Sequence, residues 1–314
     1  MDGAYALTPA ETAALTRRVT ALSVATALVL TALKAVVWVA SDSVSILASL
    51  ADSGLDLLAA LLTFFAVRYA AAPPDAEHRY GHGKAEAFAS LMQAGLVFAS
   101  AALIGQAAIE HILHPKPVSQ ESWAIGVMAV STVLTSALIA AQSWVLRRAR
   151  SVAVTGDRAH YLADLASNVV ALVAIGATAV FHAGGFDAAG GLIVALVLLW
   201  GAISVFRQSS NELLDHELPD SDRAHIVRLM TADPRLIDVH QLRTRASGPI
   251  IHMQMHADLD PALSLEVAHE VVVAAERRVL EAFPAADIII HADPMGKAEP
   301  HGGAFAEAPL PAKA

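Results

Sequence analysis

The segment VSILASLADSGLDLLAALLTFFAVRYA, residues 44–70, decides the fold of this chain. It is almost wholly apolar and longer than the roughly 20 residues that a helix needs to cross a hydrocarbon core about 30 Å thick. A run this long and continuous is typical of a helix and not of a barrel strand. Two aspartates, Asp52 and Asp56, nevertheless stand inside it. The segment therefore predicts a membrane-spanning helix that carries two carboxylates.

Five more apolar segments reach or approach spanning length: residues 19–40, 85–112, 123–146, 161–181 and 188–206. The composition agrees with them, because 55% of residues are hydrophobic, only 16% are charged and the mean hydropathy is +0.52. A globular domain carries roughly 25% charged residues. We therefore predict an α-helical membrane protein with six transmembrane helices, forming a transmembrane domain over residues 17–208.

The distribution of basic residues predicts the orientation. One set of helix ends carries most of them: Arg17, Arg18, Arg68, Arg79, Lys84, Arg147, Arg148, Arg150, Arg158 and Arg207. The opposite loops carry only Lys116. By the positive-inside rule both termini are cytoplasmic. Residues 1–16 are expected to be a cytosolic N-terminal segment and not a secretory signal, because the apolar run that follows is too long for one.

After residue 208 charged residues become frequent, which predicts a cytosolic domain over residues 209–295. Its expected elements are a helix at 221–232, strands at 237–244 and 250–258, a helix at 264–283 and a strand at 287–291. Pro219-Asp220-Ser221 provides a linker and a helix start signal. The order is that of a small α+β domain, αββαβ and ferredoxin-like or metallochaperone-like. Residues 296–314 are rich in Pro, Ala and Gly and are expected to be a disordered tail.

The residue types limit the chemistry. Cysteine is absent, so any site for a soft metal must use imidazole and carboxylate groups instead of thiolates. The net charge is −9 and no basic run occurs, so nucleic acid is not an expected partner. The 14 histidines are the natural candidates for metal ligands.

Two pairs of ionisable residues stand inside apolar segments, Asp52 with Asp56 and His160 with Asp164. A carboxylate in mid-membrane costs about 2.5–3.5 kcal/mol on insertion scales, so such residues are usually functional. Each pair has i, i+4 spacing, which places both members on one helix face. Three carboxylates and an imidazole that converge would form a tetrahedral site suited to Zn²⁺. The alternative is that they pair with Lys34, or line a watery cleft without binding metal.

The depth of the two pairs agrees. At about 1.5 Å per residue, Asp56 lies about 18 Å from Arg68 along its helix, and Asp164 lies about 21 Å from Arg150. Both arginines mark the cytoplasmic side. The two pairs are therefore predicted to meet at one level of the membrane. Lys34, in the first span, is expected to face other helices and not lipid.

These motifs resemble the cation diffusion facilitator family, most closely its bacterial zinc and iron efflux branch of zinc–proton antiporters. The resemblance covers roughly residues 17–294. The matching stretches are residues 45–56, the His160-x-x-x-Asp164 pair, 81–86, 242–245, 247–249 and 289–294. It implies a homodimer in the inner (plasma) membrane that exports Zn²⁺, with protons as the counter-ion.

The resemblance also assigns residues to sites. Asp52, Asp56, His160 and Asp164 would form the transport site. Many zinc-selective relatives have His in place of Asp52, so Cd²⁺ and Fe²⁺ stay open as substrates.

A second, more exposed metal site would use Asp75, His78 and His82 in the loop after residue 70. Two loop histidines are otherwise more often solvated polar residues. Lys84 and Asp215 resemble a charge pair at the dimer interface; the alternative is that they are two unrelated surface charges.

In the cytosolic domain the resemblance implies a binuclear, regulatory Zn²⁺ site that would use His240, His256, His269, His291 and Asp293. The strand pattern independently supports the pairing of His291 with Asp293, because residues i and i+2 share a strand face. Ala292 replaces a residue that is polar in some relatives. His216, His225 and His252 have no match in the family and are expected on the surface.

The site chemistry predicts metal–proton antiport, because metal must displace protons from its ligands. The hypothesis for coupling is that His160 carries the exchanged proton. Two other classes remain as alternatives. A membrane-bound metal sensor would use the cytosolic site alone, and an intramembrane metalloprotease would need an open coordination position. No H-E-x-x-H motif occurs, and we expect no enzymatic activity.

Overall fold

The computed structural model describes residues 7–41, 44–113, 122–181 and 186–297. The chain divides into two compact units. The helical unit comprises Ala13–Arg147 and Ser151–Ser210, and the C-terminal unit comprises chiefly the residues from Asn211 onward. The expected disordered tail lies outside the described residues, apart from its first two positions.

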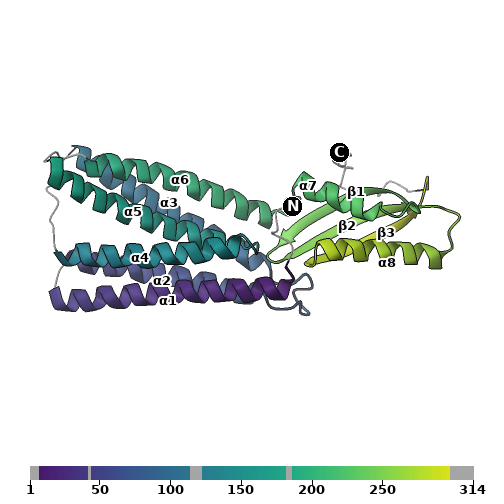
Figure 1. Cartoon of the computed structure of the whole chain (residues 1–314), viewed down its shortest axis with the longest axis horizontal. Coiled ribbons are helices and arrows are strands. Elements are labelled where there is room, and N and C mark those ends of the chain that lie inside the picture. Colours follow the sequence, from purple (N-terminus) through teal and green to yellow (C-terminus); the bar gives the residue numbers. More distant parts are fainter. Residues whose placement is uncertain (1–6, 42–43, 114–121, 182–185, 298–314) are drawn as a thin grey trace. The chain divides into compact units, whose positions relative to one another are not determined.

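In the described ranges, six long helices form the helical unit and run alongside one another (Figure 1). They are α1 (Pro9–Ser41), α2 (Val44–Ala70), α3 (Lys84–Leu113), α4 (Ser122–Leu146), α5 (Val152–Phe181) and α6 (Phe186–Leu213). All except α5 contain described segments long and apolar enough to cross a membrane. Helix α5 has 30 residues, and its first half carries Asp157, Arg158 and Asp164. The predicted helical membrane architecture is confirmed.

Two helices begin earlier than the hydrophobic pattern indicates. Helix α1 starts at Pro9, inside the segment expected to precede the first span, because Thr8 and Glu11 form a reciprocal capping box. Helix α5 starts at Val152 and not at residue 161, because the Ser151 hydroxyl accepts a hydrogen bond from the Val154 amide. Capping residues determine where these two helices begin, and a hydropathy pattern does not detect capping residues.

Helices α3 and α5 approach each other closely at Gly156. A Cβ atom at this glycine would lie 2.7 Å from Ser90 Oγ and 3.1 Å from Ser90 Cα. Small residues permit such close backbone approach between membrane helices. Further along, a cluster of buried side chains fills the space between the helices: Val97, Ala101, Ala163, Val194, Leu198 and Ala202.

The C-terminal unit has the predicted αββαβ order. Its elements are α7 (Asp220–Met230), β1 (Leu236–Ser247), β2 (Ile250–Leu259), α8 (Leu265–Ala282) and β3 (Ala286–Pro294). The sheet order is β1-β2-β3, with β1 and β2 antiparallel and β2 and β3 parallel. Gly248 has a φ of +57° at the tight β1–β2 turn, a conformation that glycine adopts without strain. Helix α8 forms the crossover that parallel strands require.

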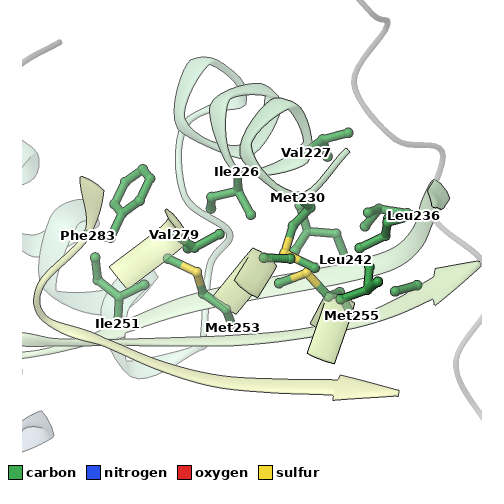
Figure 2. Close-up of a cluster of buried hydrophobic side chains, with 14 of the residues drawn as sticks. Ile226, Val227, Met230, Leu236, Leu242, Ile251, Met253, Met255, Val279 and Phe283 are labelled. Atoms are coloured by element: carbon green, nitrogen blue, oxygen red, sulfur yellow. The ribbon is translucent and has the colours of Figure 1, made fainter. Parts of the chain in front are cut away.

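Both helices of this unit pack on one face of the sheet. Figure 2 shows Ile226 and Met230 of α7 together with Met253 and Met255 of β2 and Val279 of α8 in the same apolar core. Residues at alternating positions of β2 and β3 point to the other face, which is polar. The sheet therefore has an apolar face that packs against the two helices and a polar face that carries the candidate metal ligands.

Two local details differ from the sequence prediction. Helix α7 begins at Asp220 directly after Pro219, and no side chain of the described residues caps its start with a hydrogen bond. Strand β1 contains a bulge between His240 and Arg243, where Gln241 has a φ of +50°. Bulges of this kind redirect neighbouring side chains and are common beside functional sites.

Candidate metal centres

The first candidate centre lies between α2 and α5, inside the helical unit. His160 Nε2 lies 3.1 Å from Asp56 Oδ1 and 3.9 Å from Asp164 Oδ2. One ligand atom from each of these three residues lies within 4.8 Å of the others. His160 is buried, and its Nδ1 has no hydrogen-bond partner in the described part of the chain. We call Asp56, His160 and Asp164 the membrane cluster.

The fourth predicted member of this site, Asp52, is not part of the membrane cluster. It lies one helical turn before Asp56 and is exposed. Lys34 faces α2, as expected for a basic residue inside a span. Its Nζ donates to Ser53 Oγ at 2.6 Å and to the Ser49 carbonyl at 3.2 Å.

A buried polar junction lies one turn of α5 before His160, and the sequence analysis did not identify it. The carboxylate of Asp157 accepts hydrogen bonds from Ser23 Oγ at 2.7 Å, Gln142 Nε2 at 2.9 Å and Gln93 Nε2 at 3.5 Å. All four side chains are fully buried. The junction therefore ties α1, α3 and α4 to α5. Glutamines inside otherwise apolar helices were the signal that could have revealed it.

The second candidate centre is the loop cluster, Asp75, His78 and His82, between α2 and α3. Asp75 Oδ1 lies 3.3 Å from His78 Nδ1, and Asp75 Oδ2 lies 3.2 Å from His82 Nε2. His82 is buried against the ring of Tyr69, whereas Asp75 and His78 are exposed. The His78 backbone amide donates to Asp75 and is the main cause that holds the pKa of Asp75 below its ordinary value. This carboxylate is therefore ionised and ready to bind a cation at neutral pH.

The predicted charge pair of Lys84 and Asp215 stays a prediction, because its members belong to different units. Lys84 is half-buried at the start of α3. Asp215 Oδ2 accepts a hydrogen bond from Arg245 Nη1 at 3.1 Å within the C-terminal unit.

The third candidate centre lies on the polar face of the sheet. Asp293 is at its middle, with Oδ2 at 2.7 Å from His256 Nδ1 and 3.7 Å from His240 Nε2. Its other oxygen, Oδ1, lies 3.2 Å from His291 Nε2. We call these four residues the sheet cluster. Imidazoles around a carboxylate that presents both oxygens suit zinc, and two ions can share such a carboxylate.

Two histidines differ from their predictions, one a predicted ligand and the other a predicted surface residue. His269 is exposed on α8 and is not among the residues that the structure brings together on the sheet. His252, expected on the surface, is in fact only 6% exposed, and its Nδ1 lies 3.0 Å from Asp287 Oδ2. The parallel register places His252 beside Asp287, a pairing that the sequence does not reveal. His216 is exposed and His225 is half-buried.

Comparison with known proteins gives the same outline. Residues 20–214 match the cation efflux transmembrane domain, and residues 218–295 match the cytoplasmic domain of cation efflux proteins. The cation-efflux pump FieF of Shewanella oneidensis is 40% identical over 276 residues, 87% of this chain and 92% of the relative. FieF of Klebsiella pneumoniae is 37% identical over 277 residues, 88% and 91% of the two chains. A solved structure of CzrB in its zinc form is 28% identical and covers 27% of this chain and 99% of its own, but its TM-score is 0.26, too low to carry an argument.

Proposed function

The chain belongs to the cation efflux family of multi-pass membrane transporters that export divalent metals, and from this premise we propose that it exports Zn²⁺ from the cytosol in exchange for protons. The observation that carries the proposal is the membrane cluster. Two helices far apart in sequence bring an imidazole within 3.1 Å of one carboxylate and 3.9 Å of another, in the interior of a bundle of membrane-length helices.

The donor set of the membrane cluster supports zinc as the substrate. One nitrogen and two carboxylate oxygens are ordinary zinc ligands, and Asp52 on the preceding turn of α2 can supply a fourth. Cd²⁺ and Fe²⁺ bind the same donor types and are further candidate substrates. Buried carboxylates without a bound cation are costly inside a membrane, so the cluster favours a state in which metal or protons neutralise it.

Proton exchange follows from the chemistry of the ligands. Metal binds deprotonated imidazole and carboxylate, so its binding releases protons and its release takes them up. When the cluster faces the cytosol it loses protons and takes metal, and when it faces a more acidic exterior protons displace the metal. His160 is the proposed carrier of the coupling proton, because histidine changes its charge near neutral pH.

In this proposal the C-terminal unit has two roles, regulation by bound metal and dimerisation. The sheet cluster would hold resident Zn²⁺ through the His240, His256 and His291 imidazoles and the Asp293 carboxylate. Bound ions would offset the charge of Asp293 on this face, and the match of residues 218–295 to the cytoplasmic domain of cation efflux proteins supports the homodimer. In this proposal both termini are cytoplasmic and the protein lies in the inner membrane.

The test is zinc uptake into proteoliposomes under a pH gradient, with the wild type compared with Asp56→Ala. We expect gradient-driven uptake in the wild type and its loss in Asp56→Ala. Asp260→Ala, which removes an exposed carboxylate in the C-terminal unit, is the matched control and should transport like the wild type. Equal zinc flux in Asp56→Ala and the wild type would overturn the proposed transport site. A zinc flux that is the same with and without the pH gradient would overturn antiport.

A separate variant tests the coupling role of His160. His160→Asp keeps a ligand but replaces the imidazole proton carrier. We expect it to change both metal preference and the number of protons moved per zinc. An unchanged proton count per zinc in His160→Asp would refute the role of His160 in coupling.

A further inference from the structure

The tripeptide His-Ala-Asp occurs twice in the C-terminal unit, at residues 256–258 on β2 and at residues 291–293 on β3. The two strands are parallel, and their register pairs His256 with His291 and Asp258 with Asp293. Residues i and i+2 of a strand share a face. The two tripeptides therefore present two histidines and two aspartates side by side on the polar face of the sheet.

Asp258 is the one ionisable residue of these tripeptides that has no assigned role. Its Oδ1 lies 3.5 Å from His240 Nε2, across the β1–β2 ladder. Both atoms are buried, and within the described residues neither has a hydrogen-bond partner. Buried polar atoms are costly when they are unpaired, so two of them facing one another indicate a missing partner between them.

The separations around His240 match those between ligands of one ion. Zinc bonds to nitrogen and oxygen of 2.0–2.1 Å place the ligands of a tetrahedral site about 3.3–3.4 Å apart. His240 Nε2 lies 3.5 Å from Asp258 Oδ1 and 3.7 Å from Asp293 Oδ2, close to this value and longer than hydrogen bonds. By contrast, His256 Nδ1 lies at an ordinary hydrogen-bond distance of 2.7 Å from Asp293 Oδ2.

The negative charges of Asp258 and Asp293 also favour a cation beside His240. Asp258 and Asp293 are register neighbours on one face, and like charges on neighbouring strand positions repel. A divalent cation between them removes this repulsion. The side-chain exposures of Asp258 and Asp293, 18% and 13%, leave little solvent to screen it.

We propose that Asp258 is a metal ligand, and that His240, Asp258 and Asp293 form one divalent-cation position beside a second position formed by His256, His291 and Asp293. Asp293 bridges the two ions. All five ligands of the two positions lie in the C-terminal unit of one chain. The inference rests on the proposed metal-binding role of the sheet cluster and deepens it.

The test counts bound zinc in the full-length chain. Purified protein in detergent is dialysed to equilibrium against buffered ZnCl₂, and zinc per chain is measured by mass spectrometry of the metal. We expect Asp258→Asn to bind one zinc fewer per chain, or to bind that zinc at least tenfold more weakly. The matched control is Asp260→Asn, which removes the same charge two residues along the chain from an exposed side chain. Its zinc count should equal that of the wild type.

A conservative variant separates ligand loss from misfolding. Asp258→Glu keeps a carboxylate on the same strand face and should retain the zinc count that Asp258→Asn loses. Substitution with Co²⁺ gives a second readout, because loss of a ligand changes the visible absorption of the bound cobalt. If Asp258→Asn binds as many zinc ions, with the same affinity, as Asp260→Asn, Asp258 is not a ligand.

Two further variants, His240→Ala and His256→Ala, separate the role of Asp258 from metal binding by the sheet cluster as a whole. If His240→Ala and His256→Ala lower the zinc count but Asp258→Asn does not, only the role of Asp258 is overturned. If none of the three lowers it, the sheet cluster binds no metal at this concentration and its proposed regulatory role falls as well. The uptake assay with Asp56→Ala is independent of both outcomes, because Asp56 lies in the helical unit.

Discussion

Lys34 brings a positive charge close to α2, the helix that carries Asp52 and Asp56. Its Nζ bonds to Ser49 and Ser53, which are each three residues from Asp52 and Asp56 respectively. Side chains three residues apart on a helix are neighbours, about 5–6 Å apart at Cβ. Lys34 is therefore close enough to act on the membrane cluster through its charge. If Asp52 joins Asp56 and Asp164 as a ligand, three carboxylates, one Zn²⁺ and the Lys34 charge together make the loaded site neutral.

Variants of Lys34 separate its charge from its hydrogen bonds. We expect Lys34→Gln, which keeps a donor but loses the charge, to bind zinc about tenfold more tightly and to release it more slowly, because repulsion of the ion is removed. Lys34→Arg should resemble the wild type. Zinc titration and uptake into proteoliposomes measure the two effects. If Lys34→Gln has the wild-type affinity and only Lys34→Met differs, the role of Lys34 is that of a hydrogen-bond donor.

At the scale of the element, α5 depends on a close approach to α3. Gly156 sits against Ser90 and the Cβ of Gln93, and the next residue, Asp157, is held by the buried junction. His160 follows one turn later on the same helix. The packing of α5 therefore fixes where His160 and Asp164 lie relative to α2.

Glycine-to-alanine changes test this contact. In Gly156→Ala the new methyl group would lie 3.1 Å from Ser90 Cα, so the helices must separate, and we expect a loss of about 1–3 kcal/mol in stability. Gly201→Ala in α6 is the matched control, because beyond its chain neighbours and the nearby backbone of α6 a methyl group added there would meet no described atom within 4 Å. It should be neutral or slightly stabilising, since alanine favours helix over glycine. Thermal unfolding followed by tryptophan fluorescence measures both; equal unfolding temperatures would contradict the close approach.

At the scale of the whole molecule, the described part of each unit has its own hydrophobic core and its own candidate metal sites, namely the membrane and loop clusters in the helical unit and the sheet cluster in the C-terminal unit. All four tryptophans, Trp38, Trp123, Trp144 and Trp200, belong to the helical unit, so tryptophan fluorescence reports on that unit. Calorimetry detects the unfolding of both units. The two stabilities can therefore be followed separately in one sample.

This separation allows a metal-removal experiment on the intact protein. We expect a chelator to lower the calorimetric transition of the C-terminal unit by several degrees, because ligand at about 100 times its dissociation constant stabilises by about 2.7 kcal/mol. His256→Ala should start from the lower temperature and respond little to the chelator. A C-terminal transition that is the same with and without chelator in the wild type would show that bound metal does not stabilise this unit.

The sequence alone determined the features that depend on local pattern. Apolar runs of spanning length predicted the membrane helices, and alternation with turn residues predicted the αββαβ unit, because hydrophobic periodicity follows the secondary structure directly. It also indicated that imidazole and carboxylate are the available ligands. Helices α1 and α5 begin about two turns or more before the apolar segments 19–40 and 161–181, because the caps at Thr8 and Ser151 continue these helices into polar sequence.

Only the tertiary structure decided which ligands meet. It brought Asp56 to His160 and left Asp52 and His269 outside the clusters, and it placed Asp258 against His240. It also buried His252 beside Asp287. These outcomes depend on the rotation of one helix against another and on strand register, where a shift of one residue turns every side chain to the other face. Such relations join segments that are far apart in the chain, 104 residues for Asp56 and His160, and the local pattern of neither segment contains them.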